Sequence, residues 1–302
     1  MVSFPLAWQA GVAEKAVVKR GGELFAELDL SRNREIEVPG PLGLTRIAVE
    51  KRRVRVVSDP GPRQYCVRQG WLKRAVNSEL IYPRFSILNP ELAFTLPPFQ
   101  VACGAMDISA HLMERYFTNV KNVSFTDRLI EGTLKTIMRQ APRILANPQD
   151  YDAWSEFMWA GTIAHNNLLN TGRIGDWASH DIEHEISGIY DVAHGAGLAV
   201  VFPAWMKHVL HQDLSRFVQW AVRVWNVEMD VFNPEKVALE GIARMEAFIR
   251  SLGIGTKLVD LGITDDRIDE MADKCTNGDT TTVGNFVKLD RAAVAKILRL
   301  AV

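Results

Sequence analysis

Two kinds of apolar pattern divide this chain of 302 residues. Before about residue 75, short apolar pieces are interrupted by Gly-Gly at 21–22 and by Pro-Gly-Pro at 39–41 and 60–62. The alternation of polar and apolar residues from Arg53 to Val57 predicts a strand. The rest of this segment has weak periodicity and many residues that interrupt helices and strands.

From about Asn77 onward the pattern becomes largely helical. Residues 77–100 are interpreted as a strand and a proline-bounded connector. Ser124 and Asp127 resemble a capping box at the start of a long helix, and Thr264 and Asp290 are predicted to cap two later helices. The sequence therefore predicts an all-helical second part of about eight helices, including helices at 106–117, 124–146, 150–169 and 233–252.

Composition narrows the class of protein. With 47% hydrophobic and 24% charged residues, the chain is typical of a globular protein with room for two domains. No apolar run reaches 18 residues and no secretory leader is visible, so we expect no membrane partner and a cytoplasmic location. The formal net charge of -1 favours no nucleic-acid partner, although residues 1–80 carry 14 Lys/Arg against 9 Asp/Glu. The three cysteines include no Cys-x-x-Cys pair.

All seven histidines lie after residue 110, which makes a metal site worth considering. Asp107 and His111 are four residues apart, so on a helix both side chains project from one face and can bind one ion. A surface Asp/His pair is the alternative for this isolated spacing. His208 and His211 are interpreted as surface residues, and His165 as a residue of helix packing or capping.

A second group of candidates lies between His180 and His194. On one continuous helix these two residues would be roughly 21 Å apart, too far to share an ion. Gly188 and the glycines after His194 offer a place for the helix to end, so that the chain can turn and bring His194 back. Three imidazoles and one carboxylate suit a divalent ion that keeps a position open for a substrate oxygen.

Several stretches carry a family resemblance, among them ACGAMDISAHLMERYFT and GDWASHDIEHEISGIYDVAHGAGLAVVFPAWM. From about residue 77 to 302 the chain resembles the iron-containing (group III) alcohol dehydrogenases, in the branch of butanol dehydrogenases and NADPH-dependent aldehyde reductases. The resemblance implies that Asp107, His111, His180 and His194 bind Fe(II) or Zn(II). It also implies that His184 is the active-site histidine near the nicotinamide, with a packed structural histidine as the alternative.

The same resemblance implies a function and an assembly. We expect metal-dependent, NADPH- or NADH-linked interconversion of a primary alcohol, such as butanol, and its aldehyde, by a homodimer. The expected fold is an α/β N-terminal remnant followed by an all-α metal-binding domain, as in dehydroquinate synthase-like proteins. Neither the metal nor the choice between NADH and NADPH follows from these residues.

The N-terminal segment departs from the family's pattern. We expect residues 1–100 to be an incomplete nucleotide-binding-type segment, atypical over 1–75, and residues 101–302 to be the catalytic domain. No glycine-rich pyrophosphate cradle is visible, so cofactor-binding residues stay unassigned. A truncated or frame-shifted gene is our hypothesis for this departure.

Two other functions compete with the dehydrogenase. His180, Glu183 and His184 match H-x-x-E-H, in which two histidines bind zinc and the glutamate activates water in a metallohydrolase. A catalytically impaired helical remnant, which binds metal but lacks a cofactor domain, is the other alternative. Measurable cofactor binding separates that remnant from an active enzyme.

Overall fold

The computed structural model describes five strand segments before residue 59, residue 73, and residues 86–302. The chain divides into two compact units, Met1–Leu88 and Asn89–Val302. The strand expected after residue 77 lies mostly outside the described residues. The expected boundary near residue 100 stays a prediction.

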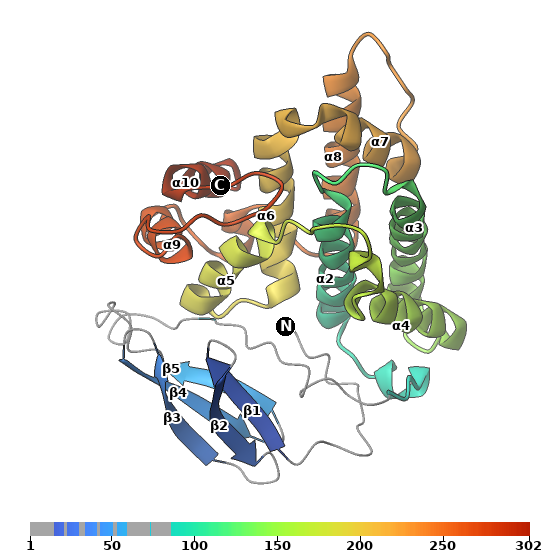
Figure 1. The fold of residues 1–302 in the computed structure, drawn as a ribbon. Coiled ribbons are helices and arrows are strands. Elements are labelled where there is room, and N and C mark those ends of the chain that lie inside the picture. The colour runs from blue at the N-terminus through green and yellow to red at the C-terminus, as the bar shows by residue number, and fades with distance from the viewer. Residues whose placement is uncertain are drawn as a thin grey trace. The chain divides into compact units, whose positions relative to one another are not determined.

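The described part of the first unit consists of strands. Strands β1 (Lys15–Arg20) and β2 (Glu23–Asp29) pair antiparallel, and β3 (Arg34–Gly40), β4 (Gly43–Glu50) and β5 (Arg53–Ser58) form an antiparallel sheet in that order (Figure 1). The strand predicted from Arg53 to Val57 is confirmed by β5.

The described strands differ from the α/β arrangement expected in this part of the chain. Two residues separate β1 from β2, β3 from β4, and β4 from β5. Connections this short allow only antiparallel hairpins, because parallel strands need a crossover of about a dozen residues or more. Short apolar pieces between glycines and prolines therefore indicate hairpins here.

The second unit is helical over its described residues, as predicted. Nine α-helices form its described part, with short 3-10 turns between some of them. The helices are α2 (Pro98–Tyr116), α3 (Ser124–Ala146), α4 (Tyr151–His165), α5 (Ala178–Tyr190), α6 (His194–Val209), α7 (Leu214–Trp225), α8 (Pro234–Ser251), α9 (Ile268–Cys275) and α10 (Arg291–Leu300).

Two of the predicted helix starts are confirmed, and two capping assignments are wrong. Helix α3 spans Ser124–Ala146, and Asp290 caps α10 by accepting a hydrogen bond from the Ala293 amide at 2.8 Å. Val123 holds the cap position of α3 and has no polar side-chain atom to cap it, and Asp127 is paired with two arginines. The Thr264 hydroxyl donates to Asp266, and α9 begins only at Ile268.

Helix α2 begins at Pro98, eight residues before the predicted start at Met106. Proline is favoured at the first position of a helix, because its fixed φ suits the helix and its missing N–H has no intrahelical partner there. The extra two turns carry Cys103 into the middle of the helix. Helix α2 is almost completely buried from Val101 to Tyr116, which makes it the central helix of the unit.

Glycine allows α6 to lie directly against α2 (Figure 1). A Cβ atom on Gly195 would lie 2.0 Å from the carbonyl oxygen of Cys103, so no larger residue fits without moving a backbone. A Cβ atom on Gly197 would lie 2.5 Å from Oε1 of Glu183 on α5. These two glycines fix the position of His194, the first residue of α6.

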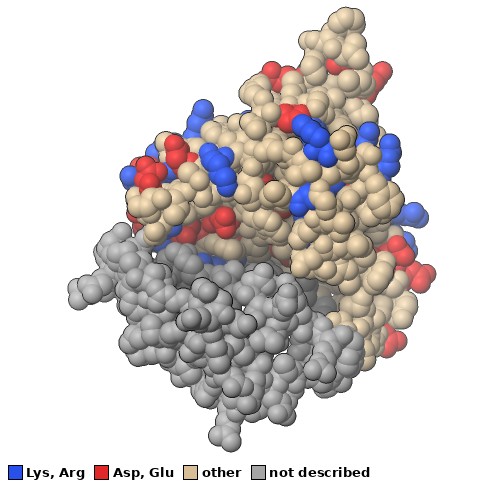
Figure 2. Space-filling view, viewed as in Figure 1, with Lys and Arg blue, Asp and Glu red and all other residues tan. Residues whose placement is uncertain are grey.

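Charges are mixed on the surface of the helical unit. Lys and Arg are interspersed with Asp and Glu over the part visible in Figure 2. No helix in the described part of the chain is long and apolar enough to cross a bilayer.

Candidate metal centre

Asp107 and His111 lie one turn apart on the buried face of α2, as their spacing predicts. The Asp107 side chain is 3% exposed, and its Oδ1 lies 3.9 Å from Nε2 of His111. An exposed surface pair is therefore the wrong alternative for these two residues. The carboxylate lies inside the helical unit, where its charge needs a counterion.

Helix α5 carries His180, and a sharp turn brings His194 back to it. The helix continues through Gly188 to Tyr190, and Asp191 ends it in the left-handed conformation with φ 54°. The turn thus comes three residues later than Gly188. The ring centroids of His180 and His194 are 5.3 Å apart, compared with roughly 21 Å on one straight helix.

The two pairs meet at Asp107. Nε2 of His194 lies 3.5 Å from Oδ1 of Asp107, and the rings of His111 and His180 are 4.6 Å apart between centroids. Asp107, His180 and His194 each present a ligand atom within 4.8 Å of the others. The structure therefore brings together all four residues that the sequence offers as metal ligands, while their role as ligands stays a prediction.

Two buried glutamates hold the imidazoles, one of which, Glu114, sequence reasoning did not assign to the site. Glu114 Oε1 accepts a hydrogen bond from Nδ1 of His180 at 2.8 Å, and Glu183 accepts one from Nδ1 of His194. Both glutamates are completely buried. A neutral imidazole carries one proton, so a proton on Nδ1 leaves Nε2 with its lone pair.

Glu114 is held by the first turn of α5 as well as by His180. Its carboxylate accepts hydrogen bonds from the amide of Trp177 at 2.6 Å and from the Ser179 hydroxyl. Negative charge is favoured at a helix N-terminus. No sequence motif marked Glu114, because 66 residues separate it from His180.

The atoms that converge on the site are hydrogen-bond acceptors. Nε2 of His180 and both carboxylate oxygens of Asp107 are buried and have no hydrogen-bond partner among the described residues. Leaving such atoms buried and unpaired costs free energy, whereas a divalent cation satisfies lone pairs and carboxylate charge together. The residues present therefore fit a resident divalent metal.

Electrostatics keep the site in the form that binds a cation. Burial opposes the charge on Asp107, but the imidazoles of His165, His111 and His194 hold its pKa well below the ordinary range. Burial, together with His180 and His165, lowers the pKa of His111 well below its usual value. An ionised carboxylate and a neutral imidazole are the protonation states of metal ligands.

His184 lies beside this group on α5, one turn after His180. Its ring centroid is 5.6 Å from that of His194, and its side chain is half-buried. Glu183, His184 and His194 form a third set of ligand-type atoms within 4.8 Å. The structure thus places His184 next to the candidate metal residues, where a proton-transfer role is geometrically available.

His165 also lies beside the site, and as the last residue of α4 it makes the kind of capping contact that the sequence suggested, with Nδ1 2.7 Å from the Gly161 carbonyl oxygen. Its Nε2 is 3.4 Å from Oδ2 of Asp107, and its ring centroid is 4.0 Å from that of His111. Because 58 residues separate His165 from Asp107, no helical spacing in the sequence links the two. The only sequence signal was that all histidines occur in the helical part.

Glu183 faces away from the place where a metallohydrolase would need it. It lies on the Nδ1 side of His194 and accepts from the Ser187 hydroxyl, with no exposed surface. In the H-x-x-E-H mechanism the glutamate has to contact a water bound to the metal. Because Glu183 accepts its hydrogen bonds on the Nδ1 side of His194, it does not fit that role.

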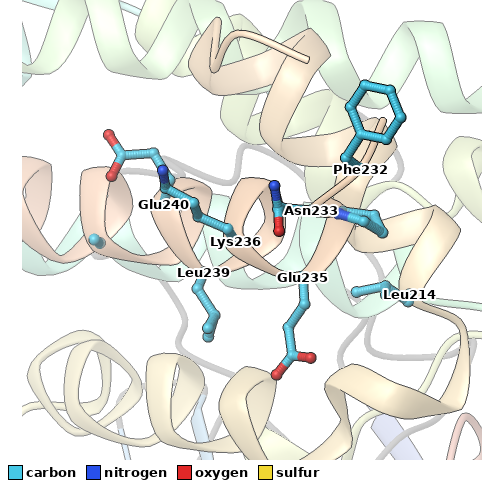
Figure 3. A pocket seen from close by; sticks show the side chains of 9 residues that line it. Leu214, Phe232, Asn233, Glu235, Lys236, Leu239 and Glu240 are labelled. Carbon is cyan, nitrogen blue, oxygen red and sulfur yellow. The ribbon is translucent and has the colours of Figure 1, made fainter. Parts of the chain in front are cut away.

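A surface groove lies elsewhere on the helical unit. It encloses about 690 Å³ between the start of α7 and the first turns of α8. Figure 3 shows Leu214, Phe232, Glu235 and Leu239 along it. It contains none of the candidate metal residues, so the groove is separate from the metal centre.

The described part of the second unit is a helical domain with a buried cluster of one carboxylate and several imidazoles, residue types that could hold a metal ion. Residues 101–302 match the family model "Fe-containing alcohol dehydrogenase family, C-terminal". The chain therefore belongs to the iron-containing alcohol dehydrogenase family, as the sequence resemblance predicted.

Individual relatives agree with this assignment. The chain is 40% identical over 233 residues to the probable NADH-dependent butanol dehydrogenase 1 of Bacillus subtilis, covering 77% of this chain and 58% of the relative. It is 34% identical to the NADPH-dependent aldehyde reductase YqhD of Escherichia coli, covering 70% and 54%. The crystal structure of NADH-dependent butanol dehydrogenase A from Thermotoga maritima matches with a TM-score of 0.70 and 36% identity, covering 75% and 58%.

The matches concern one part of the chain and one part of the relatives. The chain spans less than three fifths of the length of these relatives. Residues 1–79 match a different family model, NusG domain II. The N-terminal quarter and the helical part thus resemble separate families.

Proposed function

We propose that this chain takes part in metal-dependent, NAD(P)H-linked interconversion of primary alcohols, such as butanol, and their aldehydes. The observation that carries the proposal is the convergence of Asp107 and the Nε2 atoms of His180 and His194 on one buried point. Family membership supports it, since relatives of the helical part are named butanol dehydrogenases and an aldehyde reductase.

The proposed ligands are Asp107, His111, His180 and His194, with Fe(II) or Zn(II) as the ion. A divalent ion at such a site supplies Lewis-acid polarisation of the substrate oxygen. Asp107 contributes negative charge and stays ionised inside the unit. His180 and His194 would bind through Nε2, because Glu114 and Glu183 hold them from the Nδ1 side.

His184 is the proposed proton-transfer residue. An imidazole exchanges a proton near neutral pH, and this one lies one turn from His180 with part of its surface open to solvent. The hydride belongs to the nicotinamide nucleotide. Among the described residues we identify no phosphate cradle for that nucleotide, so NADPH and NADH stay equal candidates.

The second candidate function is a helical remnant that binds metal without a cofactor domain. The match of residues 1–79 to NusG domain II, and not to a nucleotide-binding domain, favours it. Calorimetric titration of the purified, metal-analysed chain with NADPH and then NADH separates the two. Saturable binding together with metal-dependent butanal reduction supports the enzyme, and bound metal without nucleotide binding supports the remnant.

Metal analysis of variants tests the site itself. Replacing Asp107 or His194 by alanine is expected to lower metal content, and replacing His184 to leave it unchanged. Loss of metal from the His184 variant would contradict the role proposed for His184. A cytoplasmic location and a homodimer stay predictions, and the second can be checked by light scattering.

A further inference from the structure

We infer that Trp177 is a positioning residue for His111, the proposed ligand whose ring direction no described hydrogen bond sets. This inference rests on the metal site proposed above. His180 and His194 each donate from Nδ1 to a buried glutamate. Nδ1 of His111 is also buried, but it has no hydrogen-bond partner among the described residues. Because a metal-bound imidazole is ordinarily oriented by a neighbouring group, ring packing is what can orient His111.

The indole ring of Trp177 contacts two of the proposed ligands. Its centroid lies 5.4 Å from that of His111, with the two planes at 77°. It lies 5.2 Å from that of His180, with the planes at 66°. The His165 ring also packs on His111, 4.0 Å away between centroids and tilted by 41°. Edge-to-face contacts are a preferred geometry of aromatic rings, so Trp177 favours one direction of a ligand ring on α2 and of another on α5.

Trp177 holds this place in a backbone conformation that costs free energy. Its φ is 72°, in the left-handed region that a bulky side chain rarely adopts. The Trp177 amide donates to Glu114 at 2.6 Å, and its carbonyl oxygen accepts from the Asp181 amide at 3.1 Å. A glycine would adopt the same conformation without this cost. The ring, and not the backbone, is therefore the reason for a tryptophan at this position.

Two further residues fix where the indole lies. A Cβ atom on Gly175 would lie 2.9 Å from Nε1 of Trp177, so the glycine leaves room for the ring. The guanidinium carbon of Arg115 lies 4.8 Å from the ring centroid, a distance at which cation and ring attract each other. Arg115 also donates to the carbonyl oxygen of His111 at 2.6 Å. The same arginine thus holds the backbone of His111 and the ring that packs on its side chain.

Cobalt(II) binding tests the inference without any nucleotide, because the visible absorption of bound Co(II) depends on the geometry of its ligands. The metal-free parent, Trp177→Gly and Trp177→Phe are titrated with Co(II), and Zn(II) affinity is measured by competition with a chromogenic chelator. Trp159→Ala is the matched control, because it removes an indole that is 58% exposed on α4. Unfolding in urea measures the stability of each metal-free chain separately.

Trp177→Gly is expected to bind Zn(II) at least about tenfold more weakly and to shift the Co(II) bands, because the ligand rings lose the group that orients them. Trp177→Phe is expected to restore most of the affinity and the parent's bands, since a phenyl ring keeps an edge contact. The control is expected to behave like the parent. A lower unfolding midpoint of Trp177→Gly with unchanged Co(II) bands would indicate a merely structural role and overturn the inference.

Trp177→Leu gives the same answer if Trp177→Gly does not fold. Leucine fills part of the space but has no aromatic ring, so shifted Co(II) bands are expected again, and bands like those of the parent would overturn the inference. A parent chain that binds neither ion would remove the proposed metal site, and this inference with it. Dehydrogenase activity does not enter the measurement, so failure of the proposed reaction is distinguishable from failure of this inference.

Discussion

Replacing Glu183 by glutamine isolates the role of the carboxylate behind His194. In the structure Glu183 accepts from Nδ1 of His194 and from the Ser187 hydroxyl while completely buried. A glutamine can give its carbonyl oxygen to Nδ1 of His194 and its amide N–H to Ser187 Oγ, because a hydroxyl also accepts and can still donate to the Val192 carbonyl. The variant therefore keeps both contacts but loses the negative charge behind His194.

The expected effect on metal binding follows from the lost charge. A neutral amide oxygen is a weaker acceptor than a carboxylate, so it leaves Nε2 of His194 a weaker ligand atom for the metal. Loss of such a supporting partner costs about 10–100-fold in metal affinity. That range corresponds to about 1.4–2.7 kcal/mol of binding free energy.

The assay is competition for Zn(II) between the metal-free chain and a chromogenic chelator. Glu156→Gln is the matched control, because Glu156 is exposed on α4 and the same change of charge is made there. Circular dichroism verifies that each variant keeps its helical content. An affinity of Glu183→Gln within about twofold of the control would refute the positioning role, since loss of a partner that orients a metal-bound imidazole weakens metal binding by at least about tenfold.

Three further predictions concern other residues of the helical unit. Burial and the Glu114 charge raise the pKa of Asp176 to about 7, so its proton is bound more tightly in the folded than in the unfolded state. The free energy of unfolding measured with urea should therefore fall from pH 5 to 8 in the parent, and should fall less in Asp176→Asn. Equal slopes in the two proteins would contradict this prediction. Burial raises the pKa of the Cys103 thiol to about 11, which leaves on the order of one thiolate per thousand thiols at pH 8. Mass spectrometry should therefore show alkylation of Cys103 only after unfolding. Rapid labelling of Cys103 in the native chain would contradict this prediction. Gly195→Ala should destabilise the unit by about 1–3 kcal/mol through its contact with the Cys103 backbone, and an unchanged unfolding midpoint would mean that α6 can shift at no cost.

The helical part could be predicted well because its signals are local. The boundaries of α3 and the cap of α10 follow from residues within one turn of each helix end. The pair Asp107 and His111 follows from one helical turn, whereas α5 ends at Asp191 and not at the glycine from which the return of His194 was predicted. Residue types and short spacings were sufficient for these features.

Other features of the site depend on contacts that no spacing reveals. Glu114 reaches His180 from 66 residues away, and His165 reaches Asp107 through the packing of α4 on α2. Threonine is a residue type that can cap a helix N-terminus, but the Thr264 hydroxyl donates a hydrogen bond to Asp266 instead. In each case the partner is selected by tertiary packing, and a local pattern cannot indicate it.

The described strands of the N-terminal segment were harder to predict for a different reason. Their two-residue connections indicate hairpins, yet the family resemblance of the helical part led to an α/β expectation for this segment. Local turn lengths were the better guide to the described strands. The match to NusG domain II over residues 1–79 agrees with treating this segment separately.

Because His194 is the first residue of α6, a metal ion at the proposed site would cross-link α2 to the later helices α5 and α6. An ion held by Asp107 on α2 and by His180 and His194 on α5 and α6 would close a loop of the polypeptide from residue 107 to 194. Binding free energy at such a point adds directly to the free energy of folding, because the unfolded chain has no preformed site. The proposed metal ion would then stabilise the fold before any substrate binds, and the concentration of available metal would set the fraction of the protein that is folded.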